Sequence, residues 1–304
     1  MTTKSRKAAA SRHTGVRIVA LYAALGTALP AVAAAGEVPY PIQRAECGLW
    51  AAVGAVNQNY AETQNGAVLD QETGDVPVIA LGASSLSSDP QGGTYWRIEG
   101  RYARGDTDYN GYTLSGKPVQ TTTANTIIDV GGRVGFAYGL NRRMALIPYL
   151  GLGMHHWQRN VGNGQGAGGI EDYTNGYLGG GLLWEMAVAP RVVLAVHGMA
   201  GYTFGAQITA TYPFYVDTAT NTTYYARETQ ALGDSAYESG GVRATYLIDR
   251  VWRTFVAIDV THFRYGASAA TPIFFSSGGG VSGYYEPNSR TTQVLFLAGA
   301  GARF

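Results

Sequence analysis

Apolar and polar positions alternate along much of this chain, and the alternation is clearest in its last fifteen residues, 290–304. Every second residue there, from Thr292 to Phe304, is uncharged, and the last of them is an aromatic at the end of the chain. A period of two predicts a β-strand, because successive side chains of a strand point to opposite faces. The pattern fits the final strand of a closed barrel, and it also fits an edge strand of a soluble sandwich.

The same alternation recurs elsewhere and predicts ten strands in all. They are expected at 47–61, 76–86, 94–105, 126–139, 144–159, 174–188, 192–210, 235–248, 251–265 and 290–304. Short and long connections alternate between them. The short ones are 87–93, 139–143, 189–191 and 249–250, and the long ones are 62–75, 106–125, 160–173, 211–234 and 266–289. Membrane barrels combine short periplasmic turns with longer extracellular loops. The sequence therefore predicts an all-β fold, a transmembrane antiparallel up-and-down β-barrel of about ten strands, with eight or twelve as alternatives.

One face of each expected strand is apolar, and the other carries isolated charges and glycine. In the segment 94–105, for example, Trp96 and Ile98 lie on one face, and Arg97 and Glu99 lie on the other. The period alone does not tell the inside of a barrel from its outside. The charges mix signs, however, so they can pair in a narrow lumen, and the apolar face ends in aromatic rings at matching heights. We therefore expect the apolar face to contact lipid.

The charged face predicts an ionic network inside the barrel. Its expected members are Arg97, Glu99, Arg101, Asp129, Arg133, Glu185, His197, Arg243 and Asp259. Buried charges persist only when they are paired and hydrogen-bonded, so such a network would form a rigid plug that holds the wall together. A narrow pore for ions or small solutes is the alternative interpretation.

Aromatic residues gather near the short-turn end of the expected strands. We expect a membrane belt formed by Trp50, Trp96, Tyr138, Trp184, Trp252 and Phe304. All of these except Trp50, whose strand has an ambiguous parity, lie on the apolar face. A second set, Tyr102, Tyr202 and Phe204, lies nearer the long-loop end. Two levels of amphipathic rings are typical of the two membrane–water interfaces.

Residues 1–35 differ from the rest of the chain, because five basic residues precede a short apolar run that ends in small residues. This pattern predicts a secretory signal peptide, with the barrel at 36–304 exported to the outer membrane of a Gram-negative cell. Without that segment, 17 Lys and Arg remain against 21 Asp and Glu, a net charge of −4, and no basic tract is left for nucleic acid. No cofactor or metal motif is found, and the single cysteine, Cys47, excludes an intramolecular disulfide.

Ten strands, five long outer loops and the terminal Phe304 resemble the omptin-like outer-membrane barrels, whose enzyme members are proteases. The resemblance covers the layout from about Cys47 to Phe304, and it implies an acidic pair at the end of the third strand and an Asp–His pair in the fourth outer loop. Asp106 and Asp108 stand where the first pair belongs. The fourth loop, 211–234, contains no histidine, so an omptin-like protease would need a rearranged base such as His155.

A further group of cationic side chains is expected on the outward face near the long-loop end. It consists of Arg104, His156, His262 and Arg264. Arginine binds phosphate through charge-assisted hydrogen bonds, so the group predicts contact with lipopolysaccharide, and solvated charges above the membrane are the alternative. The other expected partners are outer-membrane lipid and, through the C-terminal strand, the barrel-assembly machinery, and we expect a monomer. The favoured function is non-enzymatic, either structural or in recognition by surface loops. An omptin-like endopeptidase and a small porin are the alternatives.

Overall fold

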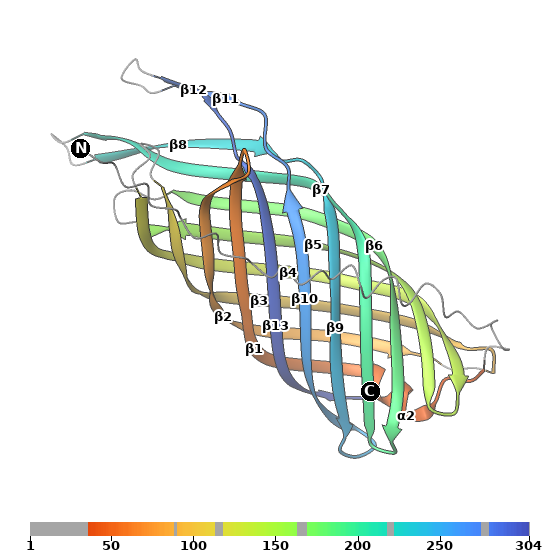
Figure 1. Cartoon of the computed structure of the whole chain (residues 1–304). Helices are drawn as coiled ribbons and strands as arrows, with labels where there is room; N and C mark the ends of the chain where they lie inside the picture. The colour runs from red at the N-terminus through yellow and green to blue at the C-terminus, as the bar shows by residue number, and fades with distance from the viewer. Residues whose placement is uncertain are drawn as a thin grey trace, which may run out of the picture. The chain divides into compact units, whose positions relative to one another are not determined.

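The computed structural model describes residues 36–87, 90–112, 118–162, 169–217, 222–274 and 280–303, and for 212–226 and 271–284 only the backbone. The expected signal peptide and Phe304 lie outside the described residues. The elements (Figure 1) are helix α2 (Tyr40–Glu46) and strands β1 (Gly48–Gln64), β2 (Ala67–Leu86), β3 (Gly93–Tyr112), β4 (Pro118–Asn141), β5 (Met144–Val161), β6 (Ile170–Ala189), β7 (Val192–Asp217), β8 (Thr222–Ala231), β9 (Ala236–Leu247), β10 (Trp252–Tyr265), β11 (Thr271–Phe274), β12 (Gly280–Tyr284) and β13 (Asn288–Ala302).

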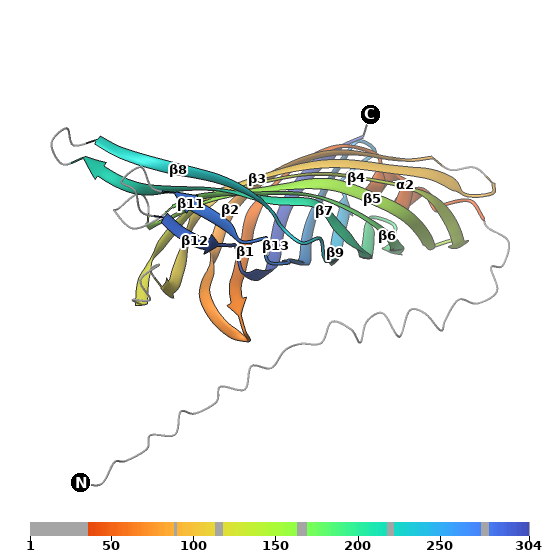
Figure 2. The ribbon, with the colours of Figure 1, turned by 90° about the horizontal axis from the view of Figure 1, so that it is seen from above.

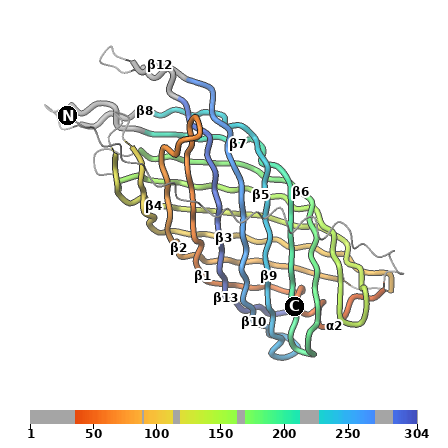
Figure 3. Tube along the Cα trace, in the orientation of Figure 1, coloured from red at the N-terminus to blue at the C-terminus, as the bar shows by residue number. Residues whose placement is uncertain are grey.

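Antiparallel pairing closes these strands into a barrel of ten. Strands β1 to β7 pair in sequence order, β9, β10 and β13 continue the ring, and β13 returns to β1. The last pairing runs from Leu49↔Ala302 to Thr63↔Asn288, so the first and last strands lie side by side (Figure 3). Closure pairs both edges of the wall strands, so the wall itself has no open edge. The predicted up-and-down barrel of ten strands is confirmed.

Several segments that were expected to be long loops continue instead as paired strands. The segment 62–75 belongs to the β1–β2 hairpin, which ends in a tight turn at Asn65 and Gly66 with φ of 50° and 81°. Asn-Gly favours such a turn, because both central residues need a positive φ. Strand β8 likewise pairs with the far half of β7, and together they form a ribbon that extends past the wall (Figures 1 and 2). The sequence concealed the β1–β2 hairpin because polar residues occupy both faces of 70–75.

The apolar face of the wall points outward and the charged face points into the lumen. On β5, Leu150 and Met154 are 62% and 61% exposed, whereas His155, the residue after Met154, is only 4% exposed. The outward side chains form an apolar band around the barrel, which is the arrangement expected of a wall that faces lipid. Short turns, among them those at 142–143 and 248–251, lie at one end of this band. We call this end the inner end and the opposite one the outer end.

Trp50 corrects one part of the predicted aromatic belt. It is 5% exposed and points into the lumen, where its ring lies 4.6 Å from the guanidinium of Arg97 and packs edge-on against Phe255. Both faces of β1 are apolar, so its period does not tell which face is outside. The structure turns Leu49 and Val53 outward, and Trp50 follows the opposite parity.

The other described members of the expected belt point outward. Trp96 and Trp252 are exposed, and Tyr138 and Trp184 are half-buried on the same outward face. All four lie toward the inner end of their strands, at the border of the apolar band. This is the level at which amphipathic rings are favoured in membrane barrels.

Helix α2 was not expected from the sequence. It lies just before β1 and contacts β2, β6, β7 and β9, so it crosses the lumen at the inner end. Ile42 and Glu46, one turn apart on one face, are fully buried there. The helix therefore closes the inner mouth of the barrel. No helix in the described ranges is long and apolar enough to cross a membrane.

Candidate functional site

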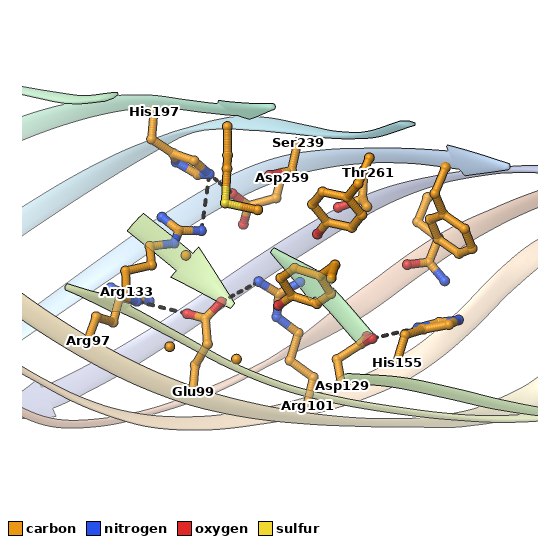
Figure 4. Close-up of a pocket in the computed structure, with 18 of the residues that line it drawn as sticks. Arg97, Glu99, Arg101, Asp129, Arg133, His155, His197, Ser239, Asp259 and Thr261 are labelled. Carbon is orange, nitrogen blue, oxygen red and sulfur yellow. Dashed lines mark hydrogen bonds and ion pairs between the residues drawn. The ribbon is translucent and has the colours of Figure 1, made fainter. Parts of the chain in front are cut away.

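The middle of the lumen is organised around Glu99. Arg97 Nε donates to one carboxylate oxygen of Glu99 at 2.8 Å, and Arg101 Nη2 donates to the other at 2.6 Å (Figure 4). The three residues alternate along β3, so all three side chains point to the same face of the strand. Their side chains are only 12–20% exposed, and two arginines on one carboxylate form a charge-assisted group with a net positive charge.

Three other strands add a second group across the lumen. His197 on β7 lies 3.3 Å from Asp259 on β10, and Arg133 on β4 lies 3.5 Å from the same ring nitrogen of His197. Arg133 also stands over the ring of Tyr149 at 5.2 Å. The two groups together have three arginines and two carboxylates, and every charged member has an oppositely charged or aromatic neighbour. The second group joins β4, β7 and β10 through its side chains.

An Asp–His pair lies nearer the outer end. Asp129 and His155 are direct neighbours on β4 and β5, and Nδ1 of His155 is 2.6 Å from Oδ1 of Asp129. The imidazole packs edge-on against Phe263, and its Nε2 is buried and has no hydrogen-bond partner among the described residues. The pair lines the same cavity as Glu99, which has a volume of only about 40 Å³. That volume accommodates a few water molecules at most.

The inner mouth is closed by a further ionic group. Arg243 on β9 contacts Glu46 of helix α2 and lies 3.4 Å from Glu185 on β6, and both carboxylates are fully buried. Glu185 and Arg243 were predicted from the alternation of their strands. Glu46 was missed, because it precedes the first strand and belongs to a helix of seven residues that gives no periodic signal.

The outer end contains the largest ionic cluster, and the sequence did not reveal it. Arg159 on β5 is 1% exposed, and its guanidinium lies within 3.4 Å of carboxylates on β1, β2 and β6. These carboxylates belong to Glu62, Asp70, Glu72 and Glu171. All four fall in segments that were expected to be loops, three in 62–75 and Glu171 in 160–173, where polar residues on both faces conceal which ones point inward. Burial, together with the negative charge of Glu286, raises the pKa of Glu62 well above its usual value.

A layer of aromatic rings separates this cluster from the middle of the lumen. Trp157 stacks on Tyr173 at 5.1 Å, Tyr173 stacks on Tyr265 at 5.7 Å, and Tyr60 packs edge-on against Trp157 at 4.9 Å. The indole N–H of Trp157 donates to Asn125 at 2.7 Å, so the buried polar atom is satisfied. The four rings are at most 2% exposed, so they fill this level of the lumen.

No protein-family model matches the chain, and no curated protein matches it in sequence. Among solved structures, the outer membrane protease OmpT from Escherichia coli is similar, with a TM-score of 0.53, 12% identity, and coverage of 84% of this chain and 97% of that one. The ten-stranded architecture of the barrel resembles that of this protease. The match to the β domain of the Bordetella autotransporter BrkA covers 85% of this chain and 100% of that one, at 14% identity and a TM-score of 0.37. The match to OprG from Pseudomonas aeruginosa covers 85% of this chain and 97% of that one, at 11% identity and a TM-score of 0.29. At these identities the likeness concerns the fold alone.

The omptin-like barrel does not bring together the three residues that a protease was expected to use. Asp106 and Asp108 are exposed on the outward face of β3, whereas His155 is buried in the lumen. The wall of the barrel therefore lies between the acids and the base, and no water could touch both. A general base must reach its proton within hydrogen-bond distance, so this set forms no catalytic site. In the described ranges, no group of three or more His, Cys, Asp or Glu side chains is arranged to hold a metal ion.

The four cationic residues expected at the lipid surface do point outward, but they are spread over three strands. Arg104 is on β3 and His156 is on β5, where its ring bonds Thr174 at 3.2 Å. His262 and Arg264 are neighbours on β10, with 3.4 Å between their nitrogens. The register of β10 and β13 places Arg264 directly opposite Arg290, and both side chains are exposed. The sequence did not identify Arg290, since it stands at the very start of its strand.

Proposed function

We propose that the chain is a non-enzymatic, integral outer-membrane barrel with a charge-plugged lumen, whose outer hairpins serve a structural or recognition role. The observation that carries this proposal is the filling of the lumen from end to end. Arg243 and helix α2 close the inner mouth, the Glu99 group fills the middle, and the Arg159 cluster fills the outer end. The cavities that remain in the described lumen, of about 40, 40 and 10 Å³, are each too small for a peptide.

The outward face supports a role in lipid contact at both membrane surfaces. Lipopolysaccharide phosphates are the partners we favour for the outer cations, because a guanidinium pairs with phosphate through two parallel hydrogen bonds. Arg264 and Arg290 stand side by side and have the geometry to hold one phosphate between them. Arg104, His156 and His262 would each contribute one contact to a phosphate at the outer end.

Assembly of the barrel would follow the usual route of an exported outer-membrane protein. The segment 1–35 would direct export, and the C-terminal strand, ending at Phe304, would be presented to the barrel-assembly machinery. We favour a monomer, because the closed ring offers no unpaired wall edge to a second copy.

Two measurements on the refolded protein test the proposal. Planar-bilayer recordings should give no steady conductance, and a mixture of peptides should remain uncleaved. A steady conductance that changes in Glu99→Gln would support a small channel instead, and cleavage that disappears in Asp106→Ala/Asp108→Ala would support an omptin-like endopeptidase. Heat-modifiable migration on a gel tests the barrel independently of either activity.

A further inference from the structure

The inner end of the barrel carries an arginine-rich rim that the proposed function does not use. Four exposed arginines in the short turns have no ion-pair partner among the described residues. We call them the inner rim: Arg142 and Arg143 in the β4–β5 turn, Arg191 in the β6–β7 turn, and Arg250 in the β9–β10 turn. Three successive short turns thus each present at least one unpaired positive charge.

Backbone hydrogen bonds join these turns into one continuous arc. The carbonyl of Arg143 accepts from Ala187 at 2.7 Å, and the carbonyl of Arg191 accepts from Leu247 at 2.8 Å. Arg303, at the end of β13, donates its backbone N–H to the carbonyl of Val251 at 2.9 Å. Figure 1 shows these turns at the same end of the barrel as helix α2. The arginines are therefore held at fixed positions along a single rim and do not lie on independent loops.

Acidic residues do little to neutralise this rim. Asp249 accepts the backbone N–H groups of Val251 and Trp252, both at 2.8 Å, and these two hydrogen bonds hold its pKa below the usual range. Asp249 therefore stays ionised; its carboxylate is held in its own turn, and its charge also attracts Arg44 and Arg191, which it neutralises only in part. Glu37 is the other acid described at this end. The four arginines of the inner rim, with Arg44 and Arg303 beside them, thus face only two acids in the described part of this end, Asp249 and Glu37.

Each arginine of the rim stands beside an exposed apolar side chain. Leu140 is 52% exposed two residues before Arg142, and Val188 is 38% exposed three residues before Arg191. Ile248, 45% exposed, lies two residues before Arg250. These three side chains continue the apolar band. An apolar anchor next to a cation is typical of a segment at the boundary between acyl chains and headgroups. A rim that faced only water, or a polymer in the periplasm, would not need the apolar neighbours.

We propose that the inner rim binds the phosphates of anionic phospholipids, of the phosphatidylglycerol class, in the inner leaflet. The proposal rests on the membrane placement given above. The short turns keep the guanidiniums at the level of the phosphates, and the apolar neighbours fix that depth. Basic residues at a membrane surface are attracted to anionic lipid, and four of them on one arc act together. The rim would thereby favour a lipid annulus enriched in anionic headgroups on one side of the membrane.

The test uses the full barrel in nanodiscs of phosphatidylethanolamine and phosphatidylglycerol mixed three to one. Native mass spectrometry of the bound lipids should show roughly a fivefold enrichment of phosphatidylglycerol over the bulk ratio for the wild type. In Arg142→Gln/Arg143→Gln/Arg191→Gln/Arg250→Gln the enrichment should fall to near the bulk ratio. The matched fourfold lysine variant keeps the charges and should keep most of the enrichment.

Three outcomes would overturn the inference. The wild type could show no enrichment, the glutamine variant could keep it, or the wild type could instead co-sediment with purified peptidoglycan in an arginine-dependent way. Heat-modifiable migration of each variant separates these outcomes from a failure of the barrel. A glutamine variant that migrates as a folded barrel but has lost the enrichment supports lipid binding by the inner rim. A wild type that never migrates as a barrel would refute the membrane placement itself.

Discussion

The Nη2 atom of Arg159 lies 2.6 Å from Oε1 of Glu72, and the two side chains are 1% and 0% exposed. The same guanidinium lies within 3.4 Å of three further carboxylates, so one cation holds four acids from three strands together. Its plane also faces the ring of Tyr60, with 4.6 Å between the guanidinium carbon and the ring centroid. Arg159 is therefore the residue on which the folded outer end depends most.

Replacing Arg159 by Met should destabilise the barrel strongly. The substitution keeps much of the volume but leaves buried carboxylates without a cation, and removing one partner of a buried ion pair costs about 3–5 kcal/mol. The free energy of unfolding in urea, followed by tryptophan fluorescence in micelles, measures the loss. Arg227→Met, an exposed arginine on β8, is the matched control and should change stability by less than about 0.5 kcal/mol. Equal stability of Arg159→Met and the wild type would contradict this account of the cluster.

Weakening the inner plug should expose the only cysteine of the chain. Cys47 directly follows helix α2, and its thiol is held between the backbone N–H and carbonyl of Leu86 at 3.3 and 3.4 Å. Glu46→Gln removes the charge that pairs with Arg243, so α2 should leave the mouth more often. We expect the rate of Cys47 labelling by a charged maleimide to rise about tenfold, which corresponds to ~1.4 kcal/mol of lost docking free energy. Glu37→Gln, an exposed acid at the same end, should leave the rate unchanged. Unaltered labelling in Glu46→Gln would mean that the ion pair does not hold the helix.

The five tryptophans should divide into a lipid-facing and a lumenal set. Trp96, Trp184 and Trp252 lie on the outward face, while Trp50 and Trp157 are buried inside. Brominated acyl chains quench only rings that contact lipid, so Trp96→Phe should reduce the quenchable fluorescence intensity, and Trp50→Phe should leave that intensity unchanged. A loss of quenchable intensity in Trp50→Phe would restore this residue to the outer belt and reverse which face of β1 points outward.

The wall of the barrel could be predicted from the sequence because membrane and lumen impose opposite demands on alternate residues. Where both demands act, as on β3 with Trp96 and Arg97, the period of two is plain. Trp50 was misplaced because β1 is apolar on both sides and either parity satisfies the pattern. Above the apolar band the outside is water, so inward and outward residues are both polar, and the ligands of Arg159 could not be told from loop residues. Helix α2 was not predicted because a helix of seven residues has too few turns for a helical periodicity to be recognised in the sequence.

The docking of the segment before β13 should depend on pH through Glu286. This side chain is 3% exposed, and its Oε1 accepts the hydroxyl proton of Tyr173 at 2.6 Å. Burial, followed by the charge of Glu171, raises the pKa of Glu286 to about 8. Tyr60 and Glu62 from β1, Asp70 from β2 and Arg159 from β5 complete the charged surroundings. A free glutamate titrates near pH 4.3, so the folded state favours the neutral carboxyl.

The sign of this shift fixes the pH dependence. Because the pKa of Glu286 is higher in the folded protein, its stabilisation is complete at acidic pH and is lost as the pH rises through about 8. The urea midpoint of the wild type should therefore fall between pH 6 and pH 9. Glu286→Gln keeps an oxygen acceptor for Tyr173 but cannot ionise, so it should reduce the fall by at least about half. Asp234→Asn, an exposed acid on the same side of the barrel, should leave the fall intact. An equal fall in Glu286→Gln would show that other carboxyls of the Arg159 cluster, and not Glu286, release the segment.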